Sequence, residues 1–232
     1  MNEEQHLDIE YFTDILCIWA YIGQVRVDEL LRNFPGQLRF RYRYIPLFGA
    51  AHDKIERDWK DKGGAKGYNA FQRETAAQWK HIHVHPELWL NQCPRSSTVP
   101  HLFLKAVDLL LAKGEHEHDG DGHSLLEETI CRVREAFFRD ARNISDFGTL
   151  DEVAEDLKLP HQKIRRLLDT GEAHAALHAD SEAYHKYQVP GSPTFIFNEG
   201  RQRLYGNLGY RIIEANVNEL LKNPEFGQAS WC

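Results

Sequence analysis

The chain has 232 residues, 42% of them hydrophobic and 27% charged, with a formal net charge of −7. This length allows one substantial core or one domain with a large insertion. The acidic balance gives no electrostatic reason to expect a nucleic-acid partner, and no apolar run reaches the length of a membrane span. The first residues, MNEEQH, lack the basic and then apolar order of a secretory signal, so we expect a cytoplasmic protein. Four cysteines do not make a disulfide framework, and we expect mostly free thiols.

The first 50 residues predict a strand, a helix and a second strand. Residues 7–12 alternate between apolar and polar side chains, as a half-buried strand does. Apolar residues recur at helical spacing over 20–34, and the pair Pro35-Gly36 ends that segment. Residues 38–45 alternate regularly and predict the second strand. A βαβ unit of this kind places its two strands parallel.

Between residue 50 and about residue 188 the pattern changes to helices. We expect helices over 68–79, 99–112 and 172–187. Capping-box patterns at Ser124–Glu127 and Thr149–Glu152 predict two more, which run to about 142 and 157. A further helix is expected after Leu159, with Pro160 in its first turn.

The last segment returns to strands. Residues 189–193 break the helical pattern, 194–197 predict a buried strand, and 198–200 are a turn signal before a short strand over 202–205. A helix over 209–221 follows. The whole outline is that of an α/β thioredoxin-like fold with a helical domain inserted between its βαβ and ββα halves. We place the two halves of the core at 1–50 and 189–232, and the helical insertion domain at 51–188.

Cys17 is the main candidate for chemistry because it lies between the first predicted strand and the first predicted helix. A helix N-terminus offers unpaired N–H groups and a positive dipole end, so we expect it to favour the thiolate. The simpler alternative is a small buried cysteine that fills the start of the helix. Ala20 stands where a dithiol site would carry its second cysteine. A lone Cys17 could attack a disulfide or an electrophile, but it could not release a protein substrate from within its own motif.

Three segments, Tyr11–Asp14, Cys17–Gly23 and Gly191–Phe195, resemble the DsbA-like branch of the thioredoxin superfamily. That branch includes disulfide oxidoreductases, 2-hydroxychromene-2-carboxylate isomerases and kappa-class glutathione transferases. The resemblance spans essentially the whole chain. It implies a nucleophile at Cys17 and a cis-proline at Pro193, with backbone groups open to an extended substrate or to glutathione.

The chain departs from each group of that branch at a position that matters for chemistry. The oxidoreductases carry a second cysteine where this chain has Ala20. The isomerases and transferases usually carry serine where this chain has Cys17. Kappa-class enzymes hold the γ-glutamyl end of glutathione with a Ser-Asp pair after the last strand, and Asn207 is at best a weak substitute for it.

We therefore expect substrate contacts from Trp19, Ser192, Pro193 and Asn207, although Trp19 could equally pack against the insert. Cys232 is a candidate resolving thiol, and the alternative is a free thiol on a mobile terminus. Two further cysteines, Cys93 and Cys131, are expected to be ordinary buried thiols.

Histidines gather in two stretches, one at 81–85 and one at 116–123, and the second also contains Asp119 and Asp121. Alternating histidines suit metal ligands sterically, but the second stretch has the composition of a solvated Gly-Asp turn. We expect no catalytic metal site.

The preferred function is a DsbA-like thiol-dependent oxidoreductase with a single active-site cysteine, Cys17, in a C-x-W-A site. We expect no tightly bound cofactor, and a small thiol such as glutathione as cosubstrate. One alternative is a glutathione-dependent transferase or isomerase that acts on a small aromatic electrophile. Another is a non-catalytic binding or chaperone module. Expected partners are glutathione or a small electrophile and protein thiols, and the chain is compatible with a homodimer.

Overall fold

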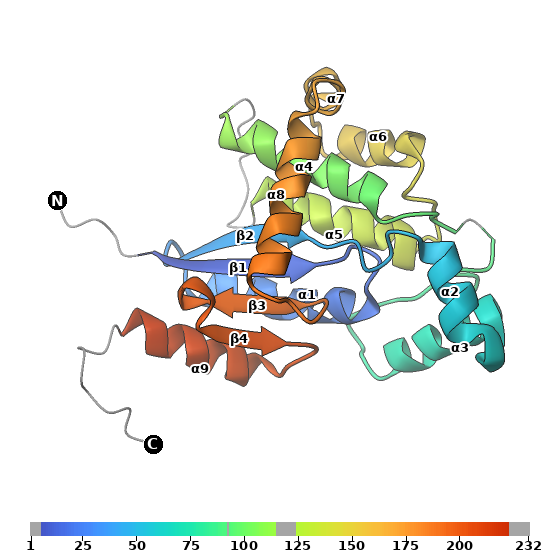
Figure 1. The fold of residues 1–232 in the computed structure, drawn as a ribbon, viewed down its shortest axis with the longest axis horizontal. Coiled ribbons are helices and arrows are strands. Elements are labelled where there is room, and N and C mark those ends of the chain that lie inside the picture. The colour runs from blue at the N-terminus through green and yellow to red at the C-terminus, as the bar shows by residue number, and fades with distance from the viewer. Residues whose placement is uncertain (1–5, 92, 115–123, 223–232) are drawn as a thin grey trace.

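A computed structural model of the chain describes residues 6–91, 93–114 and 124–222. At its centre lies a four-stranded sheet in the order β2-β1-β3-β4 (Figure 1). The strands are β1 (Leu7–Thr13), β2 (Leu38–Tyr44), β3 (Thr194–Phe197) and β4 (Gln202–Tyr205). β1 and β2 are parallel, whereas β3 is antiparallel to both β1 and β4. This topology confirms the predicted thioredoxin-like α/β fold.

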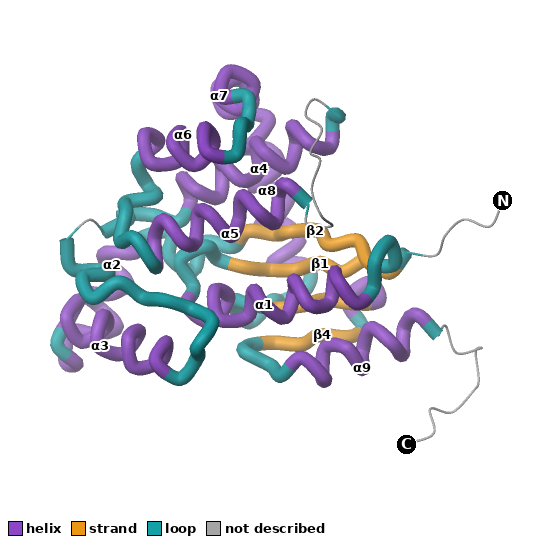
Figure 2. The backbone as a smooth tube through the Cα atoms, turned by 180° about the vertical axis from the view of Figure 1, so that it is seen from behind, coloured by secondary structure: helices purple, strands orange, loops and turns teal. Residues whose placement is uncertain are grey.

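Two helices, α1 (Ile18–Asn33) and α9 (Tyr210–Leu221), lie along one face of the sheet, and Figure 2 shows this face in front. α8 crosses the opposite face (Figure 1). The predicted helical insert lies between β2 and β3. Its elements are α2 (Ala51–Trp59), a 3-10 turn η1 (Lys60–Lys62), α3 (Gly64–Ala77), α4 (Thr98–Ala112), α5 (Leu125–Phe138), α6 (Phe147–Asp156), α7 (His161–Asp169) and α8 (Glu172–Lys186). A second 3-10 turn, η2 (Asn198–Gly200), joins β3 to β4.

Buried polar groups fasten the insert to the sheet. Arg134 of α5 is fully buried and donates to Thr13 Oγ1 at 2.9 Å. Lys105 of α4 is also buried, and its ammonium donates to the Tyr42 carbonyl of β2 at 2.8 Å and pairs with Asp180 of α8 at 2.9 Å. Removing one partner of such a buried pair is costly, so these contacts fix where α4, α5 and α8 meet the sheet.

Most predicted elements are confirmed, but α2 was not predicted. Ala51, Ile55 and Trp59 recur every four residues, as the apolar face of a helix does, so this signal was present in the sequence and was overlooked. α3 begins at Gly64 rather than at residue 68. The start was predicted too late because two glycines, which disfavour a helix, lie in the first turn. A Cβ on Gly67 would stand 1.7 Å from the Lys62 carbonyl oxygen, so only glycine permits this close approach.

The predicted helix ends need three corrections. α5 ends at Phe138 rather than near 142. The N-cap of α6 is Asp146, whose carboxylate accepts from the Gly148 N–H, and the predicted capping box at Thr149 is wrong. Pro160 is the N-cap of α7 rather than a residue inside its first turn. Ser124 is confirmed as the N-cap of α5, since its hydroxyl accepts from the Glu127 N–H.

None of the described helices is both long enough and apolar enough to cross a membrane.

Candidate active site around Cys17

Cys17 is the N-cap residue of α1 and lies where β1 gives way to that helix. Its thiol donates to the carbonyl oxygen of Ser192 at 3.3 Å. The bond between Ser192 and Pro193 is cis, as the resemblance implied. The structure therefore brings together the predicted nucleophile and the predicted cis-proline loop, which we define as residues 190–193.

Asp14 organises the polypeptide below the thiol, a role that was not predicted although Asp14 belongs to one of the three segments that carry the resemblance. One carboxylate oxygen accepts from the Leu16 N–H at 2.8 Å, and the other accepts from the Phe48 N–H at 2.9 Å and from the Ser97 hydroxyl at 2.8 Å. The Asp14 N–H donates to Ser192 Oγ at 2.9 Å. This one residue thus ties the Cys17 turn to the start of the insert, to α4 and to the cis-proline loop.

The electrostatics of this cluster favour neutral groups. Burial raises the pKa of the Asp14 carboxyl to about 6, against the opposing effect of its hydrogen bonds. Burial also lowers the pKa of His101 to about 3, helped by the charges of Lys105 and Arg134. The Ile15 N–H donates to His101 Nε2 at 3.1 Å, which assigns the single imidazole proton to Nδ1. The 3.7 Å approach of His101 to Asp14 is therefore not an ion pair.

Burial likewise raises the pKa of the Cys17 thiol, and a negative charge on Asp14 acts in the same direction. The Ser192 side chain and the N–H groups of the first turn of α1 oppose this effect but do not overcome it. The N–H groups at the helix N-terminus favour the thiolate as expected, but burial outweighs them and the net pKa of Cys17 is raised. Only 6% of Cys17 is exposed, so the cost of desolvating a charge exceeds the benefit of the helix dipole.

A cavity of about 240 Å³ opens over Cys17. It lies between the cis-proline loop and the first part of the insert, and aromatic side chains form much of its wall. The described residues that line it are Cys17, Ile18, Trp19, Leu47, Phe48, Tyr68, Phe71, Pro190, Gly191, Ser192 and Tyr205. Trp19 thus contributes to the pocket, as one of its two interpretations predicted. None of these side chains is an acid, a lysine, an arginine or a histidine.

Asn207 does not line this cavity. Its side-chain oxygen accepts a hydrogen bond from Arg26, whose guanidinium also lies 5.1 Å from the ring centre of Trp79. Asn207 therefore serves to join the loop before α9 to α1. Cys232 lies outside the described residues.

Cys93 and Cys131 are free and partly exposed rather than fully buried. Burial raises the pKa of both thiols, that of Cys131 to about 11 with further effect from Glu135 and Asp28. Neither residue lines the Cys17 cavity. They therefore offer matched control positions for experiments on Cys17.

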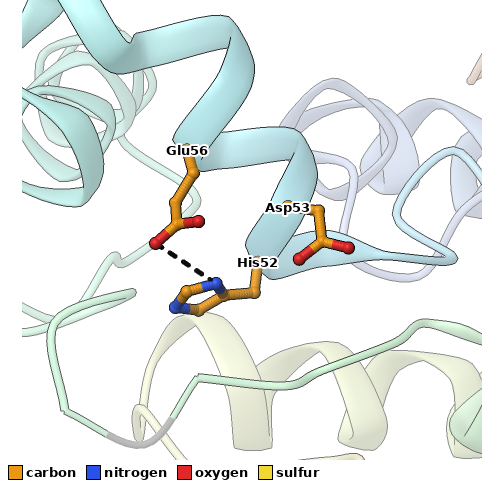
Figure 3. Close-up of side chains that lie close together, drawn as sticks. All are labelled: His52, Asp53 and Glu56. Carbon is orange, nitrogen blue, oxygen red and sulfur yellow. Dashed lines mark ion pairs between the residues drawn. The ribbon is translucent and has the colours of Figure 1, made fainter.

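The two predicted histidine stretches differ in what the structure describes. In the first, His81 Nε2 lies 3.0 Å from the Ile22 carbonyl oxygen, and the His85 Nδ1 accepts from the Glu87 N–H. The second stretch, 116–123, lies outside the described residues. A different group, His52, Asp53 and Glu56, gathers potential ligand atoms on α2 (Figure 3). All three side chains are exposed, and His52 pairs with Glu56 at 3.6 Å, so we assign them no function.

Sequence reasoning missed the wall that the insert supplies to the cavity. Tyr68 and Phe71 are three residues apart on α3, a spacing that places them on one helix face. This signal was present in the sequence, but nothing in it indicated that the face would lie over Cys17. Tyr205, on the last strand, was missed for the same reason.

Comparison with known proteins agrees with this geometry. A family model described as a DSBA-like thioredoxin domain matches residues 8–216. No curated protein matches the chain significantly. Among solved structures, the cytosolic disulfide reductase DsbM from Pseudomonas aeruginosa is 17% identical with a TM-score of 0.64, over 94% of this chain and 100% of that one. DsbM with GSH gives 18% identity and the same TM-score.

A 2-hydroxychromene-2-carboxylate isomerase is 16% identical with a TM-score of 0.64, over 93% of this chain and 97% of that one. The thiol-disulfide exchange protein alpha-DsbA2 from Wolbachia pipientis is 12% identical with a TM-score of 0.53, over 94% and 84% of the two chains. At these identities the structures establish the fold alone. The family match covers most of the chain, and the protein belongs to the DsbA-like thioredoxin domain family, whose members are thiol–disulfide oxidoreductases or isomerases.

Proposed function

We propose that this protein is a monothiol thiol–disulfide oxidoreductase that works in the reducing direction. Cys17 is the nucleophile, and a low-molecular-weight thiol such as glutathione is the cosubstrate. The observation that carries the proposal is the 3.3 Å contact between the Cys17 thiol and the Ser192 carbonyl at the floor of an open cavity. A sulfur in this position can reach a disulfide whose backbone or body rests on the cis-proline loop.

The proposed reaction has two exchange steps. The Cys17 thiol loses its proton, and the thiolate attacks one sulfur of the substrate disulfide. A mixed disulfide with Cys17 forms, and the other substrate sulfur leaves as a thiolate that takes up a proton. The external thiolate then attacks the substrate sulfur of the mixed disulfide and releases Cys17. The substrate leaves joined to that thiol, and a second molecule of the thiol completes its reduction.

The reducing direction follows from the electrostatics of Cys17. A strongly oxidising site needs a stabilised thiolate, because a thiolate of low pKa is a good leaving group. Burial here raises the pKa of Cys17, which lowers the fraction present as thiolate but makes each thiolate a stronger nucleophile and a poorer leaving group. Such a sulfur is better suited to reducing a substrate disulfide than to passing a disulfide on to substrate thiols.

The need for an external thiol follows from Ala20. This residue lies in the first turn of α1, where its N–H donates to the Cys17 carbonyl at 3.1 Å, and its methyl group cannot form a disulfide. The other described thiols, Cys93 and Cys131, do not line the cavity. The mixed disulfide must therefore be opened from solvent, unless Cys232 reaches it.

A coupled assay tests the proposal. Reduction of bis(2-hydroxyethyl) disulfide by glutathione, followed through glutathione reductase, should show enzyme-dependent turnover that Cys17→Ser abolishes. Cys131→Ser is the matched control, because that thiol is free but lies outside the cavity. Turnover that survives in Cys17→Ser, or that is equally lost in Cys131→Ser, would contradict the assignment of the nucleophile.

A second candidate is a glutathione-dependent transferase or isomerase, and the aromatic lining of the cavity is the observation that favours it. In that case, a glutathione thiolate rather than Cys17 would attack a small aromatic electrophile. Cys17→Ser would then retain activity on a chlorinated aromatic or chromene substrate. A binding or chaperone module is the third candidate, and it predicts that Cys17 forms no mixed disulfide at all.

We also propose a cytoplasmic location. The free state of Cys17, Cys93 and Cys131 suits a reducing compartment, and one protein of the same fold carries the description cytosolic disulfide reductase. Fractionation of cells that express the full-length chain tests this location, and recovery in a membrane or secreted fraction would contradict it.

A further inference from the structure

We propose that the Cys17 cavity selects substrates with an uncharged aromatic group beside the reactive sulfur, and that glutathione opens the mixed disulfide without a charged binding site of its own. The inference rests on the proposed function and specifies its substrate class. The aromatic group could belong to a small disulfide or to a residue next to a cysteine in a peptide.

The first observation is the group of aromatic side chains that remains open to solvent around a buried sulfur. Trp19 and Phe71 are each 36% exposed and Tyr205 is 52% exposed, and all three line the cavity. They come from three separate elements, α1, α3 and β4. Aromatic side chains at a ligand site prefer stacked or edge-to-face contact with another ring. An aromatic group bound here would bury apolar surface that the free protein leaves in water.

The aromatic wall is rigidly supported on the side of the insert. Tyr68 lies 5.2 Å from Trp59 and 5.6 Å from Trp89, measured between ring centroids, and Phe71 lies 5.2 Å from Trp59. Phe48 lies 5.8 Å from Trp89. These packed rings hold the wall in place before any ligand binds, which lowers the entropic cost of binding.

Tyr205 lies directly against the cis-proline loop. The hydroxyl and one ring carbon of Tyr205 are 3.1 Å from the point that a Cβ on Gly191 would occupy. Gly191 immediately precedes Ser192, whose carbonyl accepts from the Cys17 thiol. The absence of a side chain at Gly191 therefore lets the Tyr205 ring approach the backbone beside the sulfur, where it can contact the neighbouring part of a substrate.

The size of the cavity suits one ring rather than a tripeptide. A closed apolar cavity of about 150 Å³ can bind benzene. The volume of about 240 Å³ over Cys17 therefore has room for a substituted ring and its sulfur. A full glutathione molecule would extend beyond it into solvent.

The lining offers no charge to the two carboxylates and the ammonium of glutathione. Of the described cations near the lining in sequence, Lys66 and Arg73 do not line the cavity, and three others have partners. The Arg203 guanidinium donates to the Gln188 carbonyl at 2.9 Å, and Lys54 donates to Asp58 at 3.1 Å. Arg26 donates to Asn207. Glutathione is therefore expected to react as a collision partner, and other small thiols should replace it.

The test compares rates of mixed-disulfide formation at Cys17 for three disulfides. The probes are a water-soluble benzyl disulfide, bis(2-hydroxyethyl) disulfide and oxidised glutathione, each normalised to its rate with free N-acetylcysteine. We expect the benzyl probe to react about five- to tenfold faster than the others after normalisation. Phe71→Ala and Tyr205→Ala should each remove most of this advantage, measured as the ratio of the benzyl rate to the other two rates. Ile212→Ala is the matched control, since Ile212 is exposed on α9 and does not line the cavity.

Two further arms complete the test. In the first arm, the rates for disulfide peptides with Phe or Ala beside the cysteine are compared. A faster rate for the Phe peptide would show that the aromatic group can belong to a peptide as well as to a small molecule. Opening of the Cys17 mixed disulfide should depend linearly on glutathione through the millimolar range, with a similar rate constant for cysteamine. Equal normalised rates for the three probes, or saturation with glutathione but not with cysteamine, would overturn the inference and leave the proposed function intact. If no disulfide forms an adduct at Cys17, the proposed function itself fails.

Discussion

The Asp14 N–H donates to the Oγ of Ser192 at 2.9 Å, and this bond joins residues 178 positions apart in the sequence. The carbonyl oxygen of Ser192 in turn accepts a hydrogen bond from the Cys17 thiol. The turn that carries Cys17 and the cis-proline loop are therefore held together by one serine. The length of the helical insert does not loosen this connection, because both contacts join residues that closely follow β1 to a residue that closely precedes β3.

Replacing Ser192 with alanine should lower stability more than reactivity. The substitution leaves the buried Asp14 N–H without its acceptor, which should reduce the unfolding free energy by about 1–3 kcal/mol. The carbonyl that meets the Cys17 thiol remains in place. Urea unfolding and the alkylation rate of Cys17 measure the two effects. The control is Ser181→Ala, at a half-buried position of α8, whose unfolding free energy should stay within about 0.5 kcal/mol of wild type. Equal stability of Ser192→Ala and wild type would contradict the importance of this bond.

Asp14→Asn should change how stability depends on pH. Burial raises the pKa of Asp14 from 3.8 to about 6, so the folded state binds more protons than the unfolded state between these values. The contribution of Asp14 to the unfolding free energy therefore falls as pH rises through this window, by about 3 kcal/mol in total, and is constant above it. The difference in stability between wild type and Asp14→Asn should show this fall. Asp53→Asn, at an exposed position, supplies the matched control.

The same substitution should make Cys17 more reactive. A negative charge on Asp14 raises the pKa of the Cys17 thiol, and asparagine removes that charge. Alkylation of Cys17 at neutral pH should therefore accelerate by about three- to tenfold, with the pH-rate profile displaced to lower pH. An unchanged profile in a folded Asp14→Asn protein would show that the two groups are not coupled.

Ala20→Cys should convert the protein into a dithiol enzyme. The new thiol would lie three residues from Cys17 on the first turn of α1, the spacing that permits internal attack on a mixed disulfide. Mass analysis should then find an internal disulfide and a shorter-lived mixed disulfide than in wild type. Ala20→Ser supplies the control, because it has similar size and no thiol. A mixed disulfide equally long-lived in both variants would contradict the explanation based on Ala20.

Gly67→Ala should strongly destabilise the protein. The added Cβ would lie 1.7 Å from the Lys62 carbonyl oxygen, which is backbone and cannot rotate away. We expect a loss of about 3 kcal/mol or more in unfolding free energy, together with displacement of the cavity wall on α3. Gly209→Ala, which has open space around it, should cost less than about 1 kcal/mol. Thermal unfolding compares the two.

The sheet and the position of Cys17 at the start of α1 could be predicted from the sequence because both depend on local patterns. Residues 7–13 and 38–44 alternate in polarity, and Cys17 and Pro193 occupy positions that are fixed relative to these strands. The parallel pairing of β1 with β2 follows from the helix between them. These features required no knowledge of contacts across the chain.

The environment of the site could not be predicted in the same way. Asp14, Ser97 and His101 meet only because α4 packs behind the Cys17 turn, and no spacing in the sequence encodes that contact. The raised pKa of Cys17 is likewise a consequence of burial, which competes with the visible effect of the helix N-terminus. Long-range packing therefore reversed the predicted direction of the net pKa shift, while the predicted position of Cys17 beside the cis-proline loop is confirmed.

The most direct test of the account is mass analysis of the intact protein, followed by peptide mapping, after full reaction with oxidised glutathione. The account predicts one glutathione on Cys17 of the wild-type chain, none at Cys93 or Cys131, and none at residue 17 in Cys17→Ser. Release by fresh thiol should restore the original mass. A chain that stays unmodified at Cys17 while it remains folded, or that ends with Cys17 joined to Cys232, would contradict monothiol chemistry resolved from solvent.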